Sequence, residues 1–229
     1  MIEPIVTFLK KHLHDKPAVI GLSGGVDSTV VAYLLTKAIS TNKIYSFYLP
    51  SGSNTQQDLD DAKLVISKLK ITNRVINIDP IIHEFQKIEP SISALSLGNL
   101  KARVRMSVLY MQANELGGLV VGTGNRTEFE LGYFTKYGDG GVDLAPLAHL
   151  YKTQVWELAK QLGVPEQIIS KAPSAGLWSG QTDETELGMT YQMADSVLKD
   201  KDYSNLTVVE KIKQLQKSAQ HKLVLPPHL

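Results

Sequence analysis

Two hydrophobic patterns alternate along the first two-thirds of the chain. Short apolar runs, rich in β-branched and aromatic residues, lie at 18–22, 44–49, 74–78 and 118–122. Longer segments between them repeat apolar residues every three or four positions, at 27–39, 55–70 and 99–116. Short continuous apolar runs are typical of buried strands, and the longer spacing is typical of helices. We therefore expect strands at the runs and helices between them.

This order of elements predicts a fold class. Apolar strands separated by helices favour a parallel sheet covered on both faces, and right-handed crossovers make it doubly wound. After residue 145 the pattern predicts mainly helices, at 151–162, 165–170, 183–200 and 207–219. No repeat or composition break marks a linker, so we expect residues 1–229 to form a single domain with a helical C-terminal part.

Two stretches are rich in Ser, Gly and Pro and are expected to be the least ordered. They are KIEPSISALSLG at 87–98 and APSAGLWSGQT at 172–182. The second stretch is a candidate lid, because Trp178 is unusual in a solvated loop.

The chemistry begins at the first apolar run, which leads through a Gly-rich loop directly into a helical pattern. The loop reads Ser23-Gly24-Gly25-Val26-Asp27-Ser28. Adjacent glycines let the backbone approach a ligand closely, and the free N–H groups of a helix N-terminus favour phosphate. The hydroxyls of Ser23 and Ser28 would add donors beside these amides. We interpret the loop as a phosphate cradle.

Asp27 separates this interpretation from a capped turn with no ligand. A carboxylate beside a phosphate is repulsive unless a cation lies between them, which indicates bound Mg²⁺. The loop lacks the lysine of a Walker A motif, and its order G-L-S-G-G-V differs from G-x-G-x-x-G.

Composition narrows the possible classes of protein. The 229 residues carry a net charge of +1, which provides no general electrostatic attraction to nucleic acid or an anionic membrane. No residue is cysteine, which excludes disulfides, thiolate metal sites and cysteine nucleophiles. The N-terminus does not match a secretory signal and no apolar run is long enough for a membrane span, so we expect a cytoplasmic protein.

Further charged residues lie where a doubly wound sheet binds ligands. Thr123 follows a predicted strand, and Glu128 would provide a second carboxylate that shares Mg²⁺ with Asp27. Lys136 and Lys152 flank the loop YGDGGVD, which carries Asp139 and Asp143. The alternatives for these residues, taken singly, are an exposed helix-cap acid for Glu128, solvated charges for the two lysines, and a surface Asp-Gly turn for Asp139 and Asp143.

The motif S-G-G-x-D-S resembles the pyrophosphate loop of the adenylating N-type ATP pyrophosphatases, which have an adenine nucleotide alpha hydrolase-like, Rossmann-like fold. Longer strings resemble the ammonia-dependent NAD synthetases over most of the chain. These strings are GNLKARVRMSVLY at 98–110, FTKYGDGGVDLAPL at 134–147, KAPSAGLW at 171–178, TDETELGMTY at 182–191, and His221-Lys222.

The resemblance implies an enzyme that amidates deamido-NAD with ammonia, using ATP, through an adenylated carboxylate. It implies Mg²⁺ at Asp27 and Glu128. It implies ATP contacts at Ser23, Gly24, Gly25, Val26, Asp27, Ser28, Gln56, Thr123, Lys152 and Ser174. It implies dinucleotide contacts, some across a dimer interface, at Arg103, Lys136, Asp143, His221 and Lys222. Asp27, Lys152 and Asp139 are the expected catalytic residues, with Asp139 as the acceptor of the ammonium proton.

Two positions depart from the family pattern. Ser174 stands where relatives usually have Thr, which keeps the hydroxyl. Tyr48 stands where many relatives have Arg before Leu-Pro, so the expected contact from an Arg to ATP is missing there.

Three alternatives stay open at this point. An ATP domain like that of GMP synthetase would share the Gly-rich loop but not FTKYGDGG. A regulatory nucleotide-binding module would not need Mg²⁺ at the phosphates. A Ser/His/Asp hydrolase is disfavoured because the chain has no G-x-S-x-G elbow. Relatives that use glutamine carry an amidase domain with a Cys nucleophile, so the absence of cysteine favours ammonia as the nitrogen source.

Overall fold

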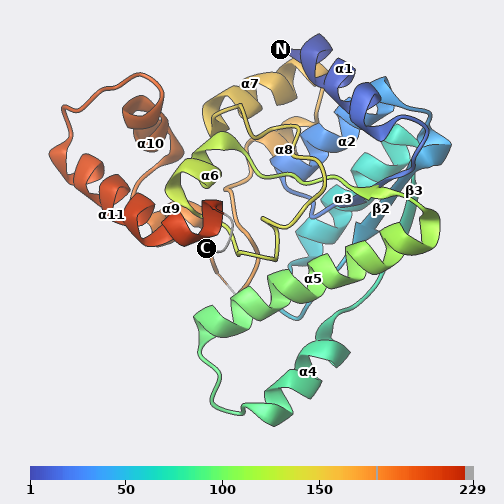
Figure 1. The fold of residues 1–229 in the computed structure, drawn as a ribbon, viewed down its shortest axis with the longest axis horizontal. Helices are drawn as coiled ribbons and strands as arrows, with labels where there is room; N and C mark the ends of the chain where they lie inside the picture. Colours follow the sequence, from blue (N-terminus) through green and yellow to red (C-terminus); the bar gives the residue numbers. More distant parts are fainter. Residues whose placement is uncertain (179, 225–229) are drawn as a thin grey trace, which may run out of the picture.

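The fold is built on a four-stranded parallel sheet. The computed structural model describes residues 1–178 and 180–224. The strands are β1 (Ala18–Gly21), β2 (Ile44–Tyr48), β3 (Thr72–Val75) and β4 (Leu119–Val120), in the order β3-β2-β1-β4. All three pairings are parallel, and Val121 bridges to Leu144 beyond β4 (Figure 1). The predicted doubly wound α/β class is confirmed.

Helices cover both faces of the sheet, as the alternation of side chains along β1 requires. Ala18 and Ile20 belong to one core with α1 (Ile2–Leu13), α2 (Val26–Ala38), α3 (Gln56–Leu69) and α7 (Lys152–Leu162). Val19 belongs to a second core with α4 (Asp79–Ile88) and α5 (Ala94–Leu116) on the opposite face. A short 3-10 turn, η1 (Thr41–Lys43), precedes β2.

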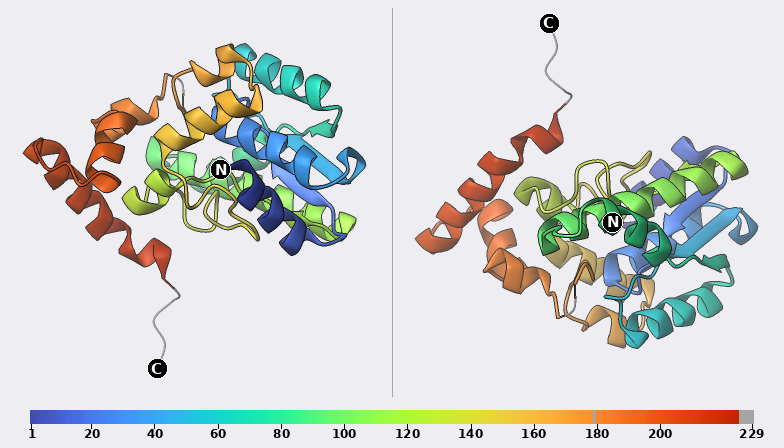
Figure 2. Two further views of the ribbon diagram at one scale, coloured as in Figure 1. Left: turned by 90° about the horizontal axis from the view of Figure 1, so that it is seen from above. Right: turned by 90° about the horizontal axis from the view of Figure 1, so that it is seen from below.

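The chain after residue 145 is mainly helical, as expected. The remaining helices are α6 (Arg126–Leu131), α8 (Glu166–Ile169), α9 (Asp183–Leu187), α10 (Tyr191–Leu198) and α11 (Leu206–Leu223). Side chains of α6, α9, α10 and α11 form a third apolar cluster around Tyr191, at the end of the molecule away from β3 (Figure 2). None of the helices described in 1–178 and 180–224 is long and apolar enough to cross a membrane.

Three predicted elements differ from the structure. The run at 74–78 is not a buried strand, because β3 lies at the edge of the sheet and Val75 is 56% exposed. The helix expected over 183–200 is two helices, because Gly188 has a φ of +67° and Thr190 caps a new one. The stretch 87–98 is largely helical, because Ser93 accepts a hydrogen bond from Ser96 N and begins α5 at Ala94.

The helix α4 was not predicted at all. Its signal is present in the sequence, because Pro80 lies in its first turn, where a missing N–H is tolerated.

Candidate active site

The candidate site lies at the carboxyl edge of the sheet, where ligands bind in doubly wound folds. The loops after β1, β2 and β4 meet at this edge. Part of the 172–182 stretch contacts the loop after β2, where Ser53 Oγ donates to the Gly176 carbonyl; Ser179 lies outside the described residues.

The phosphate loop is held by its own hydroxyls. Ser23 N donates to Ser28 Oγ at 3.2 Å, and Gly25 N donates to Ser23 Oγ at 3.2 Å. Ser28 Oγ donates to the Gly25 carbonyl at 3.1 Å. Gly25 is the N-cap of α2 and provides no side-chain cap, so the start of this helix faces the loop with unsatisfied N–H groups. The geometry is that of an anion cradle.

Gly24 gives the loop its shape. Its φ is +81°, a conformation that residues with a Cβ adopt at a cost. An added Cβ would lie 2.3 Å from the backbone oxygen of Asp58 at the start of α3. The loop is therefore packed directly against the backbone of the next crossover helix.

A charged cluster lies beside the cradle. Asp27 Oδ2 pairs with Lys152 Nζ, and Asp27 Oδ1 accepts from Asn125 Nδ2 at 3.1 Å. Lys152 is 1% exposed, and its ammonium lies 5.0 Å from the ring centroid of Tyr191. Burial opposes the charged form of Lys152, but the carboxylates of Asp27 and Glu128 outweigh it and raise its pKa.

Glu128 joins this cluster through a capping box. Asn125 Oδ1 accepts from Glu128 N at 3.0 Å, and Glu128 Oε2 accepts from Asn125 N at 3.0 Å. Desolvation and the neighbouring Asp27 raise the pKa of Glu128 well above its usual range. The structure thus brings together the two carboxylates that the sequence predicts as a pair.

The position of Lys152 is fixed from behind by a buried acid. Asp195 accepts from Thr127 Oγ1 at 2.5 Å and from Thr153 N at 2.8 Å. Thr127 Oγ1 in turn accepts from Lys152 N at 2.9 Å. Asp195 thereby locks the start of α7 onto α6.

Asp183 is the third acid near Lys152, after Asp27 and Glu128. The sequence analysis did not predict it. It is 5% exposed and accepts from Tyr191 Oη at 3.0 Å and Tyr133 Oη at 3.2 Å. It also accepts from Ala175 N at 3.2 Å, which ties the 172–182 stretch to the cluster. Burial raises the pKa of Asp183.

Four of the five residues expected to bind the dinucleotide lie together. Lys222 Nζ donates to the carbonyls of Gly132 and Phe134, each at 2.8 Å. Lys136 Nζ donates to the His221 carbonyl, and Arg103 Nε donates to the Lys136 carbonyl at 3.2 Å. The group joins the end of α11 to α5 and the YGDGGVD loop.

Asp143 is engaged elsewhere, at the sheet. It accepts from Val120 N at 2.8 Å and from Tyr110 Oη at 3.1 Å. Burial, and to a smaller extent the negative charge of Asp143, raises the pKa of Tyr110 to about 12. Both carboxylate oxygens of Asp143 therefore already serve the fold.

The other expected site residues lie at the rim. Asp139 is exposed, and its Oδ1 accepts from Thr135 N at 2.9 Å. Ser174 Oγ accepts from Gly176 N, and Thr123 is partly buried after β4. Gln56 extends along α3, where its Nε2 donates to Asp60 Oδ1 at 2.9 Å. Gln56 does not reach the cradle in this structure.

Two cations on α5, Lys101 and Arg105, also lie at the rim of the site, and the sequence analysis did not predict them. Arg105 donates to the Leu49 carbonyl at 2.9 Å and to Asn54 Oδ1 at 3.0 Å. It thus brings a guanidinium to the end of β2, next to Tyr48, where the resemblance implied an arginine. Lys101, one turn earlier, is 8% exposed. The string K-A-R-V-R does not show which of its cations point inward.

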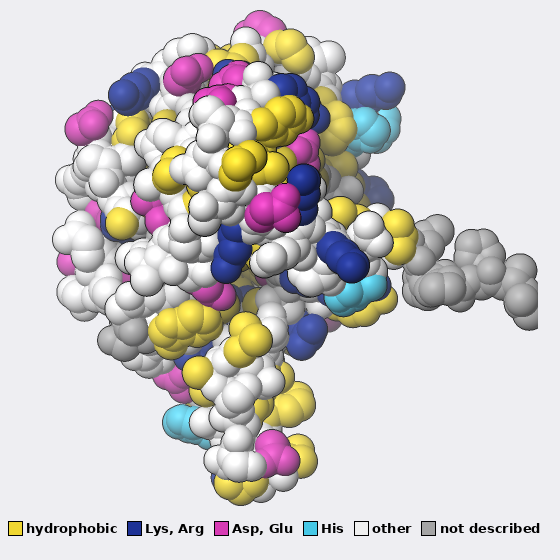
Figure 3. Space-filling view, turned by 90° about the vertical axis from the view of Figure 1, so that its left-hand side faces the viewer, with side chains coloured by type: hydrophobic (Ala, Val, Ile, Leu, Met, Phe, Trp, Pro, Cys, Tyr) yellow, Lys and Arg dark blue, Asp and Glu magenta, His cyan; other side chains and the backbone are white. Residues whose placement is uncertain are grey.

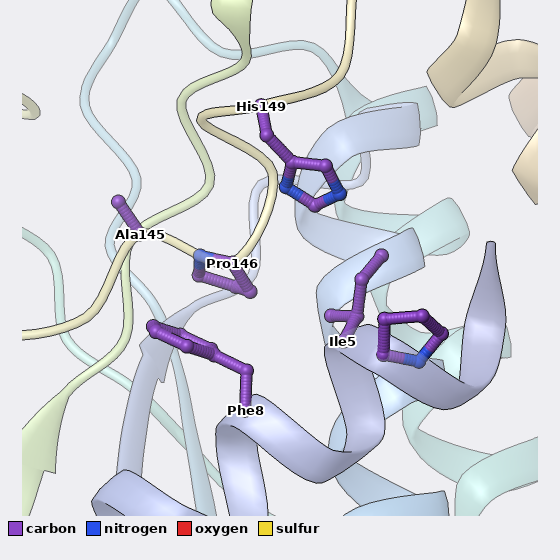
Figure 4. Close-up of a pocket in the computed structure, with 6 residues that line it drawn as sticks. Ile5, Phe8, Ala145, Pro146 and His149 are labelled. Carbon is purple, nitrogen blue, oxygen red and sulfur yellow. The ribbon is translucent and has the colours of Figure 1, made fainter.

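A separate apolar pocket of about 140 Å³ lies between α1 and the segment before α7 (Figure 4). Ile5, Phe8, Pro146 and His149 line it, together with Pro4 and Ala145. It is smaller than the usual size of ligand sites, and none of the expected site residues lines it. It is not the nucleotide site.

Asp27 and Glu128 can provide two oxygen ligands for Mg²⁺, but the described residues provide no third carboxylate ligand. Within 1–178 and 180–224, no group of three or more His, Cys, Asp or Glu side chains could hold a metal ion. Asp27 and Glu128 are oxygen donors beside a phosphate cradle, and one lysine is shared among three acids. Mg²⁺ is typically held by one or two carboxylates plus substrate phosphates, which this arrangement allows.

Comparisons with known proteins agree with this geometry. The family model for NAD synthase matches residues 1–226. An NH(3)-dependent NAD(+) synthetase of Thermoplasma acidophilum is 47% identical, over 98% of this chain and 95% of its own.

Two solved structures are similar over the whole chain and over 96% of their own. They are an NMN synthetase from Francisella tularensis, with a TM-score of 0.94 and 40% identity, and an NH3-dependent NAD synthetase from Campylobacter jejuni, with a TM-score of 0.83 and 29% identity. With the phosphate cradle and the acid–lysine cluster in place, the chain belongs to the NAD synthase family.

Proposed function

We propose that this enzyme amidates the nicotinate carboxylate of deamido-NAD with ammonia, forming NAD, AMP and pyrophosphate from ATP. NAD synthases are ligases that form a C–N bond in the last step of NAD biosynthesis. The observation that carries the proposal is the cradle at the start of α2 with the ion pair of Asp27 and Lys152 beside it.

The first step transfers AMP to the substrate. The carboxylate oxygen attacks the α-phosphorus of ATP, the bond to the bridging oxygen breaks, and pyrophosphate leaves with the negative charge. Such transfers depend on positioning and charge neutralisation rather than on a protein nucleophile. The free N–H groups at the start of α2 and the ammonium of Lys152 would stabilise the departing charge.

We assign Ser23, Gly24, Gly25, Val26, Asp27, Ser28, Gln56, Thr123, Lys152 and Ser174 to ATP. Asp27 and Glu128 would hold Mg²⁺, which would neutralise phosphate charge when bound. Arg103, Lys136, Asp143, His221 and Lys222 are assigned to the dinucleotide. For Gln56 this requires its side chain to leave Asp60, and for Asp143 it requires a contact in addition to its two present donors.

In the second step ammonia attacks the activated carbonyl carbon and AMP leaves. Ammonium dominates at neutral pH, so a proton acceptor is needed. Asp139 is exposed beside the group of Arg103 and Lys222, which supports that role. The chain has no cysteine, so it holds no thiol that could release ammonia from glutamine by itself.

Glu128→Gln is expected to separate stability from catalysis. Because burial raises the folded-state pKa of Glu128 above its unfolded value, its ionisation destabilises the fold. The variant should be no more stable than the wild type at acid pH. It should gain stability as pH rises through the unfolded value and on to the folded one. Urea unfolding across pH measures this gain.

The same variant should need roughly tenfold more Mg²⁺ for half-maximal pyrophosphate release, because one ligand is neutral. Glu130→Gln, on the same helix but paired with Arg126, is the matched control and should change neither property in this way. An unchanged Mg²⁺ requirement for Glu128→Gln would remove Glu128 from the metal site.

The direct test of function combines the protein with ATP, Mg²⁺, deamido-NAD and ammonium, and follows NAD and pyrophosphate. Formation of both in equal amounts supports the proposal. Pyrophosphate release with a different acid, such as XMP, would move the enzyme within the adenylating class. ATP binding without pyrophosphate release would indicate a regulatory module.

A second candidate substrate is the carboxylate form of NMN. It is favoured by the likeness to the NMN synthetase from Francisella tularensis, which is 40% identical over the whole of this chain. The reaction would use the same cradle and cluster. Measuring kcat/KM for the mononucleotide and the dinucleotide in one preparation, with each as competitor of the other, decides between them.

We further propose that the enzyme is a homodimer. Ile81, Phe85 and Ile88 are exposed at a spacing that places them on one face of α4, and Leu95 of α5 is exposed nearby in sequence. Hydrophobic side chains gather on the projection that holds α4 (Figure 3). An apolar surface of this kind on a projecting helix is typical of an interface.

Phe85→Asp is expected to shift the protein to monomer in sedimentation experiments, because a charge would be buried in the interface. His83→Asp introduces the same charge on another face of α4 and should leave the dimer intact. A monomeric wild type, or a Phe85→Asp variant that stays dimeric, would contradict this interface. A cytoplasmic location stays a prediction.

A further inference from the structure

Two loops that border the site meet on one residue of α5. Lys101 Nζ donates to the Leu177 carbonyl at 2.8 Å and to Ser53 Oγ at 3.1 Å. Ser53 Oγ also donates to the Gly176 carbonyl at 2.8 Å. The loop after β2 and the lid segment, residues 174–177, are therefore joined through one ammonium and one hydroxyl.

Packing around this junction is tight. A Cβ on Gly98, one turn before Lys101, would lie 3.2 Å from the side chain of Leu177 and 3.3 Å from the ring of Trp178. Gly176 has a φ of +61°, and a Cβ there would lie 3.0 Å from the amide of Asn54. The lid segment is thus fitted against both α5 and the loop after β2.

The ammonium of Lys101 forms no ion pair with any acid of the described residues, and Asp79 attracts it only from a greater distance. Within the described part of the chain, its side chain makes hydrogen bonds only to these two neutral oxygens, and it is 8% exposed. Burial and the nearby Arg105 lower the pKa of Lys101. A buried charge without a counter-ion is costly, so packing alone does not explain a lysine here.

The backbone N–H groups of the lid segment are anchored separately. Ala175 N donates to Asp183, and Leu177 N donates to Gln181 Oε1 at 2.8 Å. Asp183 belongs to the cluster around Lys152. Lys101 and Asp183 therefore hold the lid segment from two sides, with the expected ATP contact Ser174 beside them.

We propose that Lys101 is a positioning residue that latches the lid segment onto the loop after β2. Because Lys101 joins these two loops, the pocket that binds the nucleotide and the lid segment that excludes water are expected to become ordered together. Its link to ATP rests on the proposed function, because Ser174 lies in the lid segment and Gln56 directly follows the loop after β2. Its effect on the lid segment does not depend on any ligand.

The test uses Lys101→Met in a Trp156→Phe background, so that Trp178 is the sole fluorophore of its kind. Phe at position 156 keeps an aromatic ring against Tyr191 and removes only an indole N–H that has no partner among the described residues. Without ligand, Trp178 emission should shift to longer wavelength in Lys101→Met. Lys101→Arg, which keeps the charge, should recover part of the shift. Lys10→Met, exposed on α1, should show none.

Kinetics add a readout that simple unfolding would not change. Loss of charged hydrogen bonds predicts a KM for ATP about tenfold higher and more pyrophosphate released per amide formed, because water reaches the adenylate. Partial unfolding would instead lower kcat alone. Ser53→Ala removes the second tie without touching the charge and should show the same changes to a smaller extent, even if Lys101→Met does not fold.

Unchanged Trp178 emission in both variants would overturn the latch, whatever the activity. If emission shifts but the wild type consumes no ATP with deamido-NAD or the mononucleotide, the latch stands and the proposed function fails.

Discussion

Replacing Lys152 with Met is expected to lower the rate of pyrophosphate release by about a hundredfold to a thousandfold, as removal of a preorganised charge does elsewhere. It should also lower the free energy of unfolding by roughly 3–5 kcal/mol at neutral pH, the usual cost of breaking a buried pair. The physical reason is the same for both effects. Asp27, Glu128 and Asp183 would share a site without a cation.

The stability loss should depend on pH. Glu128 and Asp183 already have pKa values raised by burial, so their ionised forms destabilise the fold. Removing Lys152 raises them further. The extra loss in the variant is absent below the folded-state pKa that these carboxyls have in the wild type, and it grows as pH rises from there towards their higher folded-state pKa in the variant. Urea unfolding at about pH 5 and about pH 8 should show the larger loss at the higher pH.

Lys160→Met, an exposed change on the same helix, is the control and should alter neither activity nor its pH dependence. An equal loss of stability for Lys152→Met at both pH values would mean that the lysine matters through packing on Tyr191 rather than through charge.

The second large effect is expected from Gly24→Ala. An alanine at this position would have to adopt a φ of +81°. Its Cβ would also lie 2.3 Å from a backbone oxygen of α3, which cannot rotate away as a side chain can. The loop must therefore change shape, and the N–H groups that face phosphate move with it. Pyrophosphate release should fall by at least about a hundredfold, equivalent to roughly 2.7 kcal/mol of barrier.

Two matched glycines separate the causes. Gly163→Ala also requires a positive φ, +74°, but its Cβ would meet nothing within 4 Å. It should cost about 1 kcal/mol of stability with normal catalysis. Gly25→Ala has an ordinary φ of −88°, and its Cβ would meet only Ser23 Oγ at 3.3 Å, so its effect should be smaller. A normal KM for ATP in Gly24→Ala would contradict the cradle.

The phosphate loop could be predicted from sequence because its function is local. Adjacent glycines, flanking serines and a following helix determine the cradle within six residues. The pairing of Asp27 with Glu128 was also accessible, because both follow strands that end at one edge of the sheet. The capping box of Asn125 and Glu128 carries a further local signal that was not used.

The remaining site residues depend on tertiary packing. Lys101 is buried and Arg105 half-buried only because two loops from distant parts of the sequence cover α5. Asp183 reaches Lys152 only because α10 folds back onto α7 and places Tyr191 between them. Likewise, β3 can be polar because it lies at the edge of the sheet. Its edge position could not be predicted, because the periodicity of a single strand does not give the order of the strands.

The most direct test of adenylation at this site follows oxygen rather than rate. The substrate acid, whichever the enzyme prefers, is labelled with oxygen-18 in its carboxylate and converted with unlabelled ATP and ammonium. Attack on the α-phosphorus predicts one labelled oxygen in AMP and none in pyrophosphate. Label in inorganic phosphate, with ADP as the other product, would show attack on the terminal phosphorus and contradict the account.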